Sequence, residues 1–155
     1  MIIIAAMSED RIIGSGDGMP WDVPEEYEQY IQFVTGQTVI MGRRTYEIFG
    51  SDLSPDTTVV VISRTAKFSG VHVVNSFDAA NEFASSTGKV VFVAGGASVY
   101  ERAIPSADEM LLSTIKGTFD GDTYFPEFDR REWNIVSQRN ELKYVFRHFK
   151  RRPAS

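Results

Sequence analysis

A single carboxylate, Glu26, stands at the edge of an apolar helix face. Residues 24–35 carry apolar side chains at helical spacing, with Tyr27 and Tyr30 among them. Each residue turns an α-helix by about 100°, so Glu26 lies roughly 70° from the centre of the apolar face, whereas Glu25 lies roughly 170° away. Glu25, Glu28, Gln29 and Gln32 are therefore expected to face water. A buried carboxylate is costly unless a partner offsets the cost. Glu26 is therefore either a functional acid or a boundary residue that interacts with the helix dipole.

Two strand-to-helix turns have the composition of a phosphate site. The apolar segment 90–94 runs into Gly95 and Gly96 and then into a helix start, where glycine lets a backbone amide approach an anion. The segment 38–41 leads in the same way into Gly42, which two arginines follow. Because the helix dipole disfavours cations at an N-terminus, a bound anion would remove that conflict.

A third apolar strand, 57–62, ends in Ser63 and Arg64. Each of these features alone is also typical of a tight turn or of a solvated surface charge. Together, three such strand ends favour a dinucleotide with an additional phosphate, because ligands of an open parallel sheet bind at the carboxyl ends of its strands. Arginine suits a ribose 2′-phosphate, which favours NADPH over NADH.

Apolar strands and helices alternate along the chain and must position these residues. Helices are expected at 24–35, from 42 to about 50, from 76, and from 97 to 104. Strands are expected at 2–7, 38–41, 57–62, 71–74, 90–94 and 109–115, with an antiparallel pair at 133–139 and 143–149. The pattern predicts an α/β fold whose mostly parallel sheet is covered on both faces. The segments 8–18 and 116–129 are expected to be loops.

Composition narrows the function classes. The 155 residues suggest one domain, 1–155, with 151–155 as a frayed tail. A net charge of -5 argues against nonspecific nucleic-acid binding. There is no cysteine, and the two histidines are far apart, so no metal site is expected. The first residues read as a buried strand and not as a signal or membrane segment, so we expect a cytoplasmic protein that binds no membrane and acts as a monomer.

Several common motifs are missing from the sequence. It has no G-x-G-x-x-G followed by an acid about 20 residues later, no Walker motif and no G-x-S-x-G. A lone acid in an apolar cleft beside a reduced nicotinamide instead suggests hydride transfer assisted by proton delivery.

In several ordered segments the chain resembles the dihydrofolate reductases, over nearly its whole length. The segments are IAA at 4–6 with RIIG at 11–14, MPW at 19–21, VIMGRRT at 39–45, SR at 63–64, GGASVY at 95–100 and GDTYFP at 121–126. The resemblance implies a dihydrofolate reductase-like fold, an eight-stranded, mostly parallel sheet with an antiparallel C-terminal edge strand, flanked by four helices. It also implies NADPH as hydride donor, reduction of 7,8-dihydrofolate to tetrahydrofolate, and a place in folate metabolism as an antifolate target.

The resemblance assigns roles to individual residues. Glu26 matches the catalytic acid that holds the pterin, and Trp21 would hold an ordered water beside it. Met19 lies in a loop, 14–22, that would close over the nicotinamide, and Asp122 would dock this loop.

The remaining implied contacts form two sets. The substrate would contact Ile4, Ala5, Glu26, Tyr27, Tyr30, Leu53 and Ser113. The cofactor would contact Ala6, Ile13, Gly14, Met19, Gly42, Arg43, Arg44, Thr45, Ser63, Arg64, Gly95, Gly96, Ala97, Ser98, Val99 and Tyr100.

One departure from the family keeps other substrates open. The family places an arginine just before the third strand for the glutamate tail of folate, but here the segment 54–58 reads SPDTT. We therefore expect a high KM for dihydrofolate or tolerance of shorter pterins. The alternatives are a reductase of another pterin or of a riboflavin-pathway aminopyrimidine, and a dinucleotide-binding module without catalysis.

Overall fold

A computed structural model describes residues 1–16 and 18–154. Asp17, in the loop expected to close over the nicotinamide, and Ser155, in the expected tail, lie outside the described residues. Within the described part, no helix is long and apolar enough to cross a membrane.

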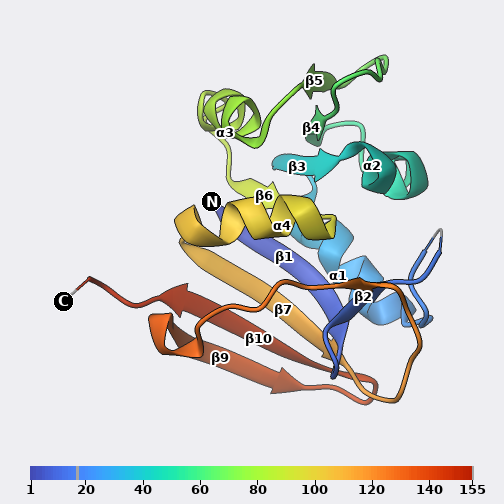
Figure 1. Cartoon of the computed structure of the whole chain (residues 1–155), viewed down its shortest axis with the longest axis vertical. Coiled ribbons are helices and arrows are strands. Elements are labelled where there is room, and N and C mark those ends of the chain that lie inside the picture. The colour runs from blue at the N-terminus through green and yellow to red at the C-terminus, as the bar shows by residue number, and fades with distance from the viewer. Residues whose placement is uncertain (17, 155) are drawn as a thin grey trace.

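Eight strands form one twisted sheet in the order β5-β4-β3-β6-β1-β7-β10-β9 (Figure 1). Their bounds are β1 Ile2–Ser8, β3 Thr38–Gly42, β4 Thr58–Ile62, β5 His72–Val74, β6 Val91–Val93, β7 Glu109–Ile115, β9 Trp133–Asn140 and β10 Tyr144–Arg151. Six of these strands pair in parallel, whereas β10 runs antiparallel to both β7 and β9. The expected fold class is confirmed, with the antiparallel strand lying just inside the sheet edge that β9 forms.

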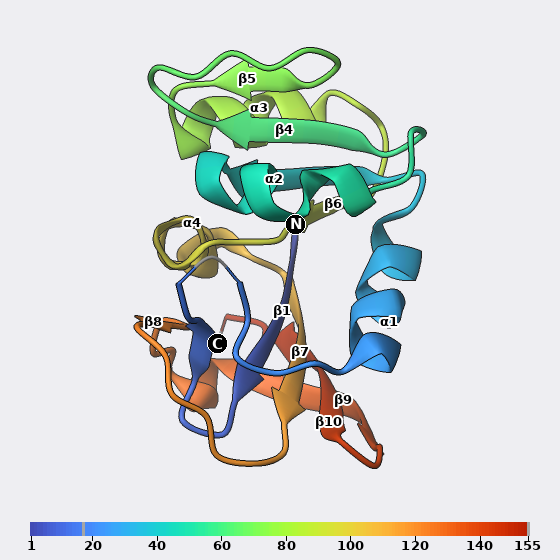
Figure 2. The ribbon, with the colours of Figure 1, turned by 90° about the vertical axis from the view of Figure 1, so that its right-hand side faces the viewer.

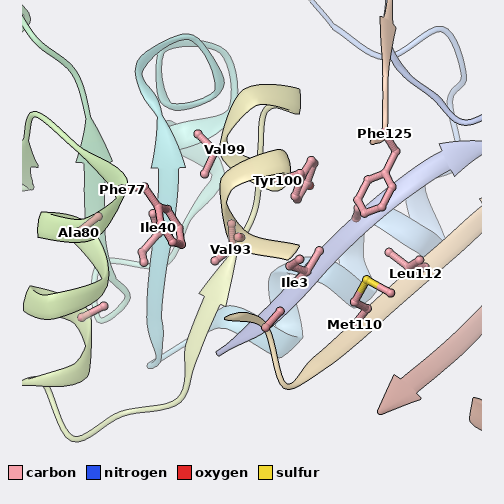
Figure 3. Packing of buried hydrophobic residues seen from close by; sticks show 14 of the residues in the cluster. Ile3, Ile40, Phe77, Ala80, Val93, Val99, Tyr100, Met110, Leu112 and Phe125 are labelled. Carbon is pink, nitrogen blue, oxygen red and sulfur yellow. The ribbon is translucent and has the colours of Figure 1, made fainter. Parts of the chain in front are cut away.

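The helices divide between the two faces of the sheet. The described residues form four α-helices, α1 Pro24–Val34, α2 Arg43–Phe49, α3 Phe77–Ser85 and α4 Ala97–Ala103. Short 3-10 turns lie at η1 Gly50–Asp52, η2 Ile104–Ser106 and η3 Arg130–Glu132. Side chains of α3 and α4 pack with Ile3, Ile40 and Val93 on one face (Figure 3). Side chains from α1 and α2 pack on the other face, around Val39 and Met41. The central strands are therefore covered on both sides, as their continuous apolar runs predict.

A second, small sheet lies where the sequence predicts only loops. Strand β2, Ile12–Gly14, pairs with β8, Thr123–Tyr124. A Cβ atom added to Gly121 would collide with the Ile12 side chain and the Gly14 carbonyl, so glycine permits this close approach. The two segments are more than a hundred residues apart in sequence, and their pairing ties the two loops together beside β1 (Figure 2).

The chain end is more ordered than the sequence suggests. Arg151, expected to begin a frayed tail, is the last residue of β10. Its Nε donates to the Ala107 carbonyl at 2.8 Å, and its guanidinium carbon lies over the Trp133 ring, 4.3 Å from the ring centroid. The backbone amide of Arg152 donates to the Glu132 carbonyl at 2.8 Å. The prediction of a frayed tail is therefore wrong at Arg151, because these long-range contacts hold this residue in place.

Candidate active site

The carboxylate of Glu26 is buried at the floor of a cleft. Its residue is 7% exposed, in the first turn of α1, whose Val34 and N-cap Val23 pack against the sheet. The side chain of Ser113, on β7, donates a hydrogen bond to the carboxylate. Ser113 is itself 2% exposed and lies opposite Ala6 of β1 in the strand register. The angle calculated from helix geometry is thus confirmed, and Glu26 faces the sheet while Glu25 is exposed.

Burial is the main influence on the pKa of Glu26. It raises the pKa of Glu26 from 4.5 to about 7, and the hydrogen bond from Ser113 only partly opposes that rise by favouring the charged form. At neutral pH, therefore, both protonation states of Glu26 are populated. An acid poised near the working pH is suited to proton transfer.

The cleft has a volume of about 750 Å³ and lies across the middle of the sheet. Residues of β1, β7 and β10 line it on the side of the sheet, together with the turn after β6, and α1 and α2 line it on the other side. The residues expected at the substrate that line it are Ile4, Ala5, Glu26, Tyr27, Tyr30 and Ser113. The residues expected at the cofactor that line it are Ala6, Ile13, Met19, Thr45, Gly95, Gly96 and Tyr100. The structure therefore brings six of the seven expected substrate residues and seven of the sixteen expected cofactor residues to one continuous surface.

Two expected active-site residues lie just beside this cleft. Trp21 is half-buried in an adjoining hollow that shares Met19, Glu26 and Tyr27 with the cleft. Its ring packs edge-on against Phe119, with 5.5 Å between the ring centroids. Leu53 is partly buried among the apolar residues under α1, outside the cleft lining.

The turns after β3 and β6 meet at the cofactor side of the cleft. The Gly42 amide donates to the Gly95 carbonyl at 2.8 Å, which joins the two turns. Gly95 has a φ of +109°, a conformation that favours glycine, and a Cβ atom on Gly96 would lie 3.6 Å from Thr45 Oγ1. Because Gly42 and Gly96 are the N-cap residues of α2 and α4, the first-turn amides of both helices have no side-chain cap. The arrangement fits the phosphates of a dinucleotide, which such amides can bind.

The other expected cofactor residues surround these two turns. Ala97, Ser98 and Val99 form the first turn of α4, and Val99 is buried. Arg43 begins α2 and pairs with Glu47 at 3.3 Å, and Arg44 donates to the Gly16 carbonyl at 3.2 Å.

A separate hollow lies at the ends of β4 and β5. Its volume is about 710 Å³, and Ser63, Arg64 and Lys67 are among the residues that line it. The Ser63 hydroxyl accepts a hydrogen bond from the Ala66 amide at 3.0 Å, so this turn is ordered. Two cations in one hollow fit a phosphate group, and the sequence analysis had identified only one of them.

A backbone hydrogen bond joins the segment around Asp122 to the start of the loop 14–22. The Asp122 amide donates to the Gly14 carbonyl at 3.1 Å, and the Asp122 carboxylate accepts from Thr123 Oγ1 at 3.0 Å. Asp122 thus lies next to the loop that carries Met19, as the resemblance implies.

Sequence reasoning missed five residues that line the cleft. They are Gln29, Phe49, Ala94, Leu111 and Phe146. Gln29 was assigned to the solvent face of α1, but its side-chain oxygen accepts hydrogen bonds from Arg139 and from the Tyr144 hydroxyl. The antiparallel strands β9 and β10 supply these partners, and helical periodicity alone carries no signal for them.

Comparison with known proteins places this geometry in one family. Residues 1–151 match the family model described as dihydrofolate reductase. A dihydrofolate reductase type A13 from Escherichia coli is 37% identical over 137 residues, which cover 87% of this chain and 82% of that protein. A dihydrofolate reductase from Bacillus subtilis is 32% identical over 160 residues, 98% of this chain and 95% of that protein. A structure of the Enterococcus faecalis dihydrofolate reductase complexed with NADP(H) and RAB-propyl aligns with a TM-score of 0.89 and 27% identity, covering 98% of this chain and 96% of that one.

The raised pKa of Glu26 has a measurable effect on folding. The folded carboxyl keeps its proton at pH values where the unfolded one releases it, so the folded state binds more protons between pH 4.5 and about 7. Stability therefore falls as pH rises through this window and levels off above it. At about 1.4 kcal/mol per pKa unit, the loss approaches about 3 kcal/mol.

Glu26→Gln should remove this loss. Relative to wild type, the variant should become more stable by about 3 kcal/mol between pH 4.5 and pH 8, measured as free energies of unfolding in urea. Glu25→Gln, one residue away and exposed, is the matched control and should follow wild type. If Glu26→Gln also follows wild type at every pH, the carboxyl is not desolvated.

Proposed function

This chain belongs to the dihydrofolate reductase family and reduces 7,8-dihydrofolate to 5,6,7,8-tetrahydrofolate with NADPH, and we propose that Glu26 is the acid on which that reaction depends. The buried carboxylate carries this proposal, because Glu26 is the carboxylic acid among the described residues that line the cleft and has a pKa near neutrality. Of the three interpretations left open by the sequence, family membership selects the first.

Glu26 would bind the pterin ring of the substrate. A carboxylate in this position accepts two charge-assisted hydrogen bonds, from the amino group and the adjacent ring N–H. Ser113 holds the carboxylate against β7 and leaves its other lone pairs for the pterin. The negative charge so placed raises the basicity of the ring nitrogen beside the carbon to be reduced. The Glu26 side chain would thus both orient the pterin and raise the proton affinity of its ring nitrogen.

Dihydrofolate reduction consumes one hydride and one proton, and the bound NADPH supplies the hydride. Ala6, Ile13 and Tyr100 would border the nicotinamide, and the Tyr100 hydroxyl is held by the Ile4 carbonyl at 2.8 Å. Thr45, Gly95 and Gly96 would lie at the cofactor phosphates, with the amides of α2 and α4. Arg43 and Arg64 would bind the 2′-phosphate, and Arg44 would assist them.

The loop around Met19 would exclude bulk water. Met19 lines both the cleft and the adjoining hollow that contains Trp21, so it lies between the two. Trp21 would hold one ordered water within reach of the pterin, as the proton route, while the rest of the site stays dry. Asp122 would hold this loop through its contact with Gly14. One copy of the chain provides all of these residues, so the proposed site needs no second copy.

Replacement of Glu26 by Gln tests the central assignment. Gln keeps the size but cannot bind the pterin as an anion, so kcat at pH 7 should fall by roughly 10²- to 10⁴-fold. NADPH affinity, measured by quenching of protein fluorescence, should not change. Glu25→Gln should keep wild-type turnover, followed as absorbance at 340 nm. More than about a tenth of wild-type rate in Glu26→Gln would remove Glu26 from the mechanism.

Arg64→Ala and Arg43→Ala test the placement of the 2′-phosphate. Each loses a charge-assisted contact, so the Kd for NADPH should rise roughly ten- to hundredfold, and the Kd for NADH should change little. Arg102→Ala, in the last turn of α4, is the control and should alter neither. Equal losses for NADPH and NADH would show that these arginines do not read the additional phosphate.

A further inference from the structure

One end of the cleft lies between α1 and the segment 49–57, which begins at the last residue of α2. The Tyr27 hydroxyl donates to Asp52 Oδ2 at 2.6 Å, near the start of the helix. Thr57 Oγ1 donates to the Val34 carbonyl at 3.3 Å, at the end of the helix. The segment therefore runs along α1 from its first turn to its last, on the side of the molecule where Figure 2 shows α1. We call this end of the cleft the outer groove. Tyr27, Tyr30 and Phe49 line it, Asp52 accepts the hydrogen bond of Tyr27 beside it, and Asp56 lies farther along the segment.

Given the proposed function, the tail of the substrate would leave along this groove. With the pterin held at Glu26, the aminobenzoyl ring would lie next to Tyr27, Tyr30 and Phe49, three aromatic side chains that line the cleft. The terminal glutamate of dihydrofolate carries two carboxylates at neutral pH. These would lie beyond the rings, beside the 52–56 stretch.

The outer end of the groove is negative. Asp52 lies against Tyr27 of its wall, and Asp56 Oδ2 lies 3.9 Å from where a Cβ atom on Gly36 would stand, just past the end of α1. The helix C-terminus adds partial negative charge, and its last turn has no basic residue. Neither α1 nor residues 46–58 contain a lysine or an arginine. A cation does approach from outside the groove, since the ammonium of Lys89 donates to Thr58 Oγ1 at 3.1 Å.

The phenols of the groove lie in the same negative field. Burial chiefly raises the pKa of Tyr27 and of Tyr30, and the charges of Asp52 and Glu26 raise both further. Asp52 therefore acts on the wall that a substrate tail would touch.

We propose that the outer groove selects substrates by the charge of their tail, with Asp52 and Asp56 as specificity-determining residues. Reduced pterins whose tail is uncharged or cationic bind better than those that end in glutamate carboxylates, and additional glutamates weaken binding further. The chemical reason is repulsion between like charges. For two carboxylates a few ångströms apart in solvent, this repulsion amounts to roughly threefold in KM.

The sharpest test compares dihydrofolate with its glutamate diamide, in which both tail carboxylates are carboxamides. The two compounds have the same size and the same pterin, so only charge differs. KM should be several-fold lower for the diamide at equal kcat, with NADPH saturating. Raising ionic strength from about 0.05 to about 0.5 M should lower KM for dihydrofolate, because salt screens repulsion, and should leave KM for the diamide unchanged.

Variants identify the residues responsible. Asp52→Asn and Asp56→Asn should each lower KM for dihydrofolate roughly threefold and reduce its salt dependence. Asparagine at 52 can still accept from the Tyr27 hydroxyl, so the wall keeps its shape. Glu82→Gln, an exposed carboxylate on α3 on the opposite face of the sheet, is the charge-matched control and should leave KM unchanged. Thr57 is unsuitable for introducing a cation, because it is buried against α1.

Three outcomes decide the proposal. A lower KM for dihydrofolate than for the diamide, with KM rising with salt, would overturn it. A rise in KM for dihydrofolate alone in Lys89→Ala would also overturn it, because Lys89 would then bind the tail. Lack of turnover with both compounds would instead contradict the proposed function, and it would be recognised because kcat, not KM, is lost.

Discussion

The desolvation of one carboxylate is the constraint on which this site depends. Glu26 lies beside apolar strands with Ser113 as its hydrogen-bond donor, and burial raises its pKa to about 7. A fully paired acid in the same place would be stable but would stay ionised, and an exposed one would be ionised as well. The hydrogen bond from Ser113 offsets only part of the desolvation cost, so the carboxylate can still accept further hydrogen bonds. The N–H groups of a pterin ring can donate them. Binding of the substrate at Glu26, as proposed, would recover part of the free energy lost on folding.

The sheet topology explains how the proposed acid would lie beside the cofactor. Strand β1 lies at the centre, between β6 and β7, so a ligand over its end contacts residues from both neighbours. Strands β3 and β6 are adjacent and parallel, and each leads directly into a helix. Their two glycine turns therefore meet, and the amides of two helix starts point toward the same space. The substrate and cofactor halves of the cleft are consequences of one strand order.

Much of this could be predicted from the sequence because it depends on local patterns. The position of Glu26 followed from helical geometry, and the strand ends followed from apolar runs that stop at glycine. The pairing of β2 with β8 could not be predicted, because two- and three-residue strands have no periodicity and depend on a partner more than a hundred residues away. Gln29 was misplaced for a related reason. Its environment is set by Arg139 and Tyr144 of the terminal strands, which cover a helix face that periodicity assigns to water.

The titration of Glu26 itself tests the account most directly. Carbon-13 NMR of protein labelled at glutamate carboxyl carbons, with Glu26→Gln used to assign the resonance, gives the pKa in the folded enzyme without ligands. We expect a value near 7 for Glu26. A value near 4.5 would contradict it, because the carboxylate would then be solvated in the folded protein and the cleft would have no poised acid.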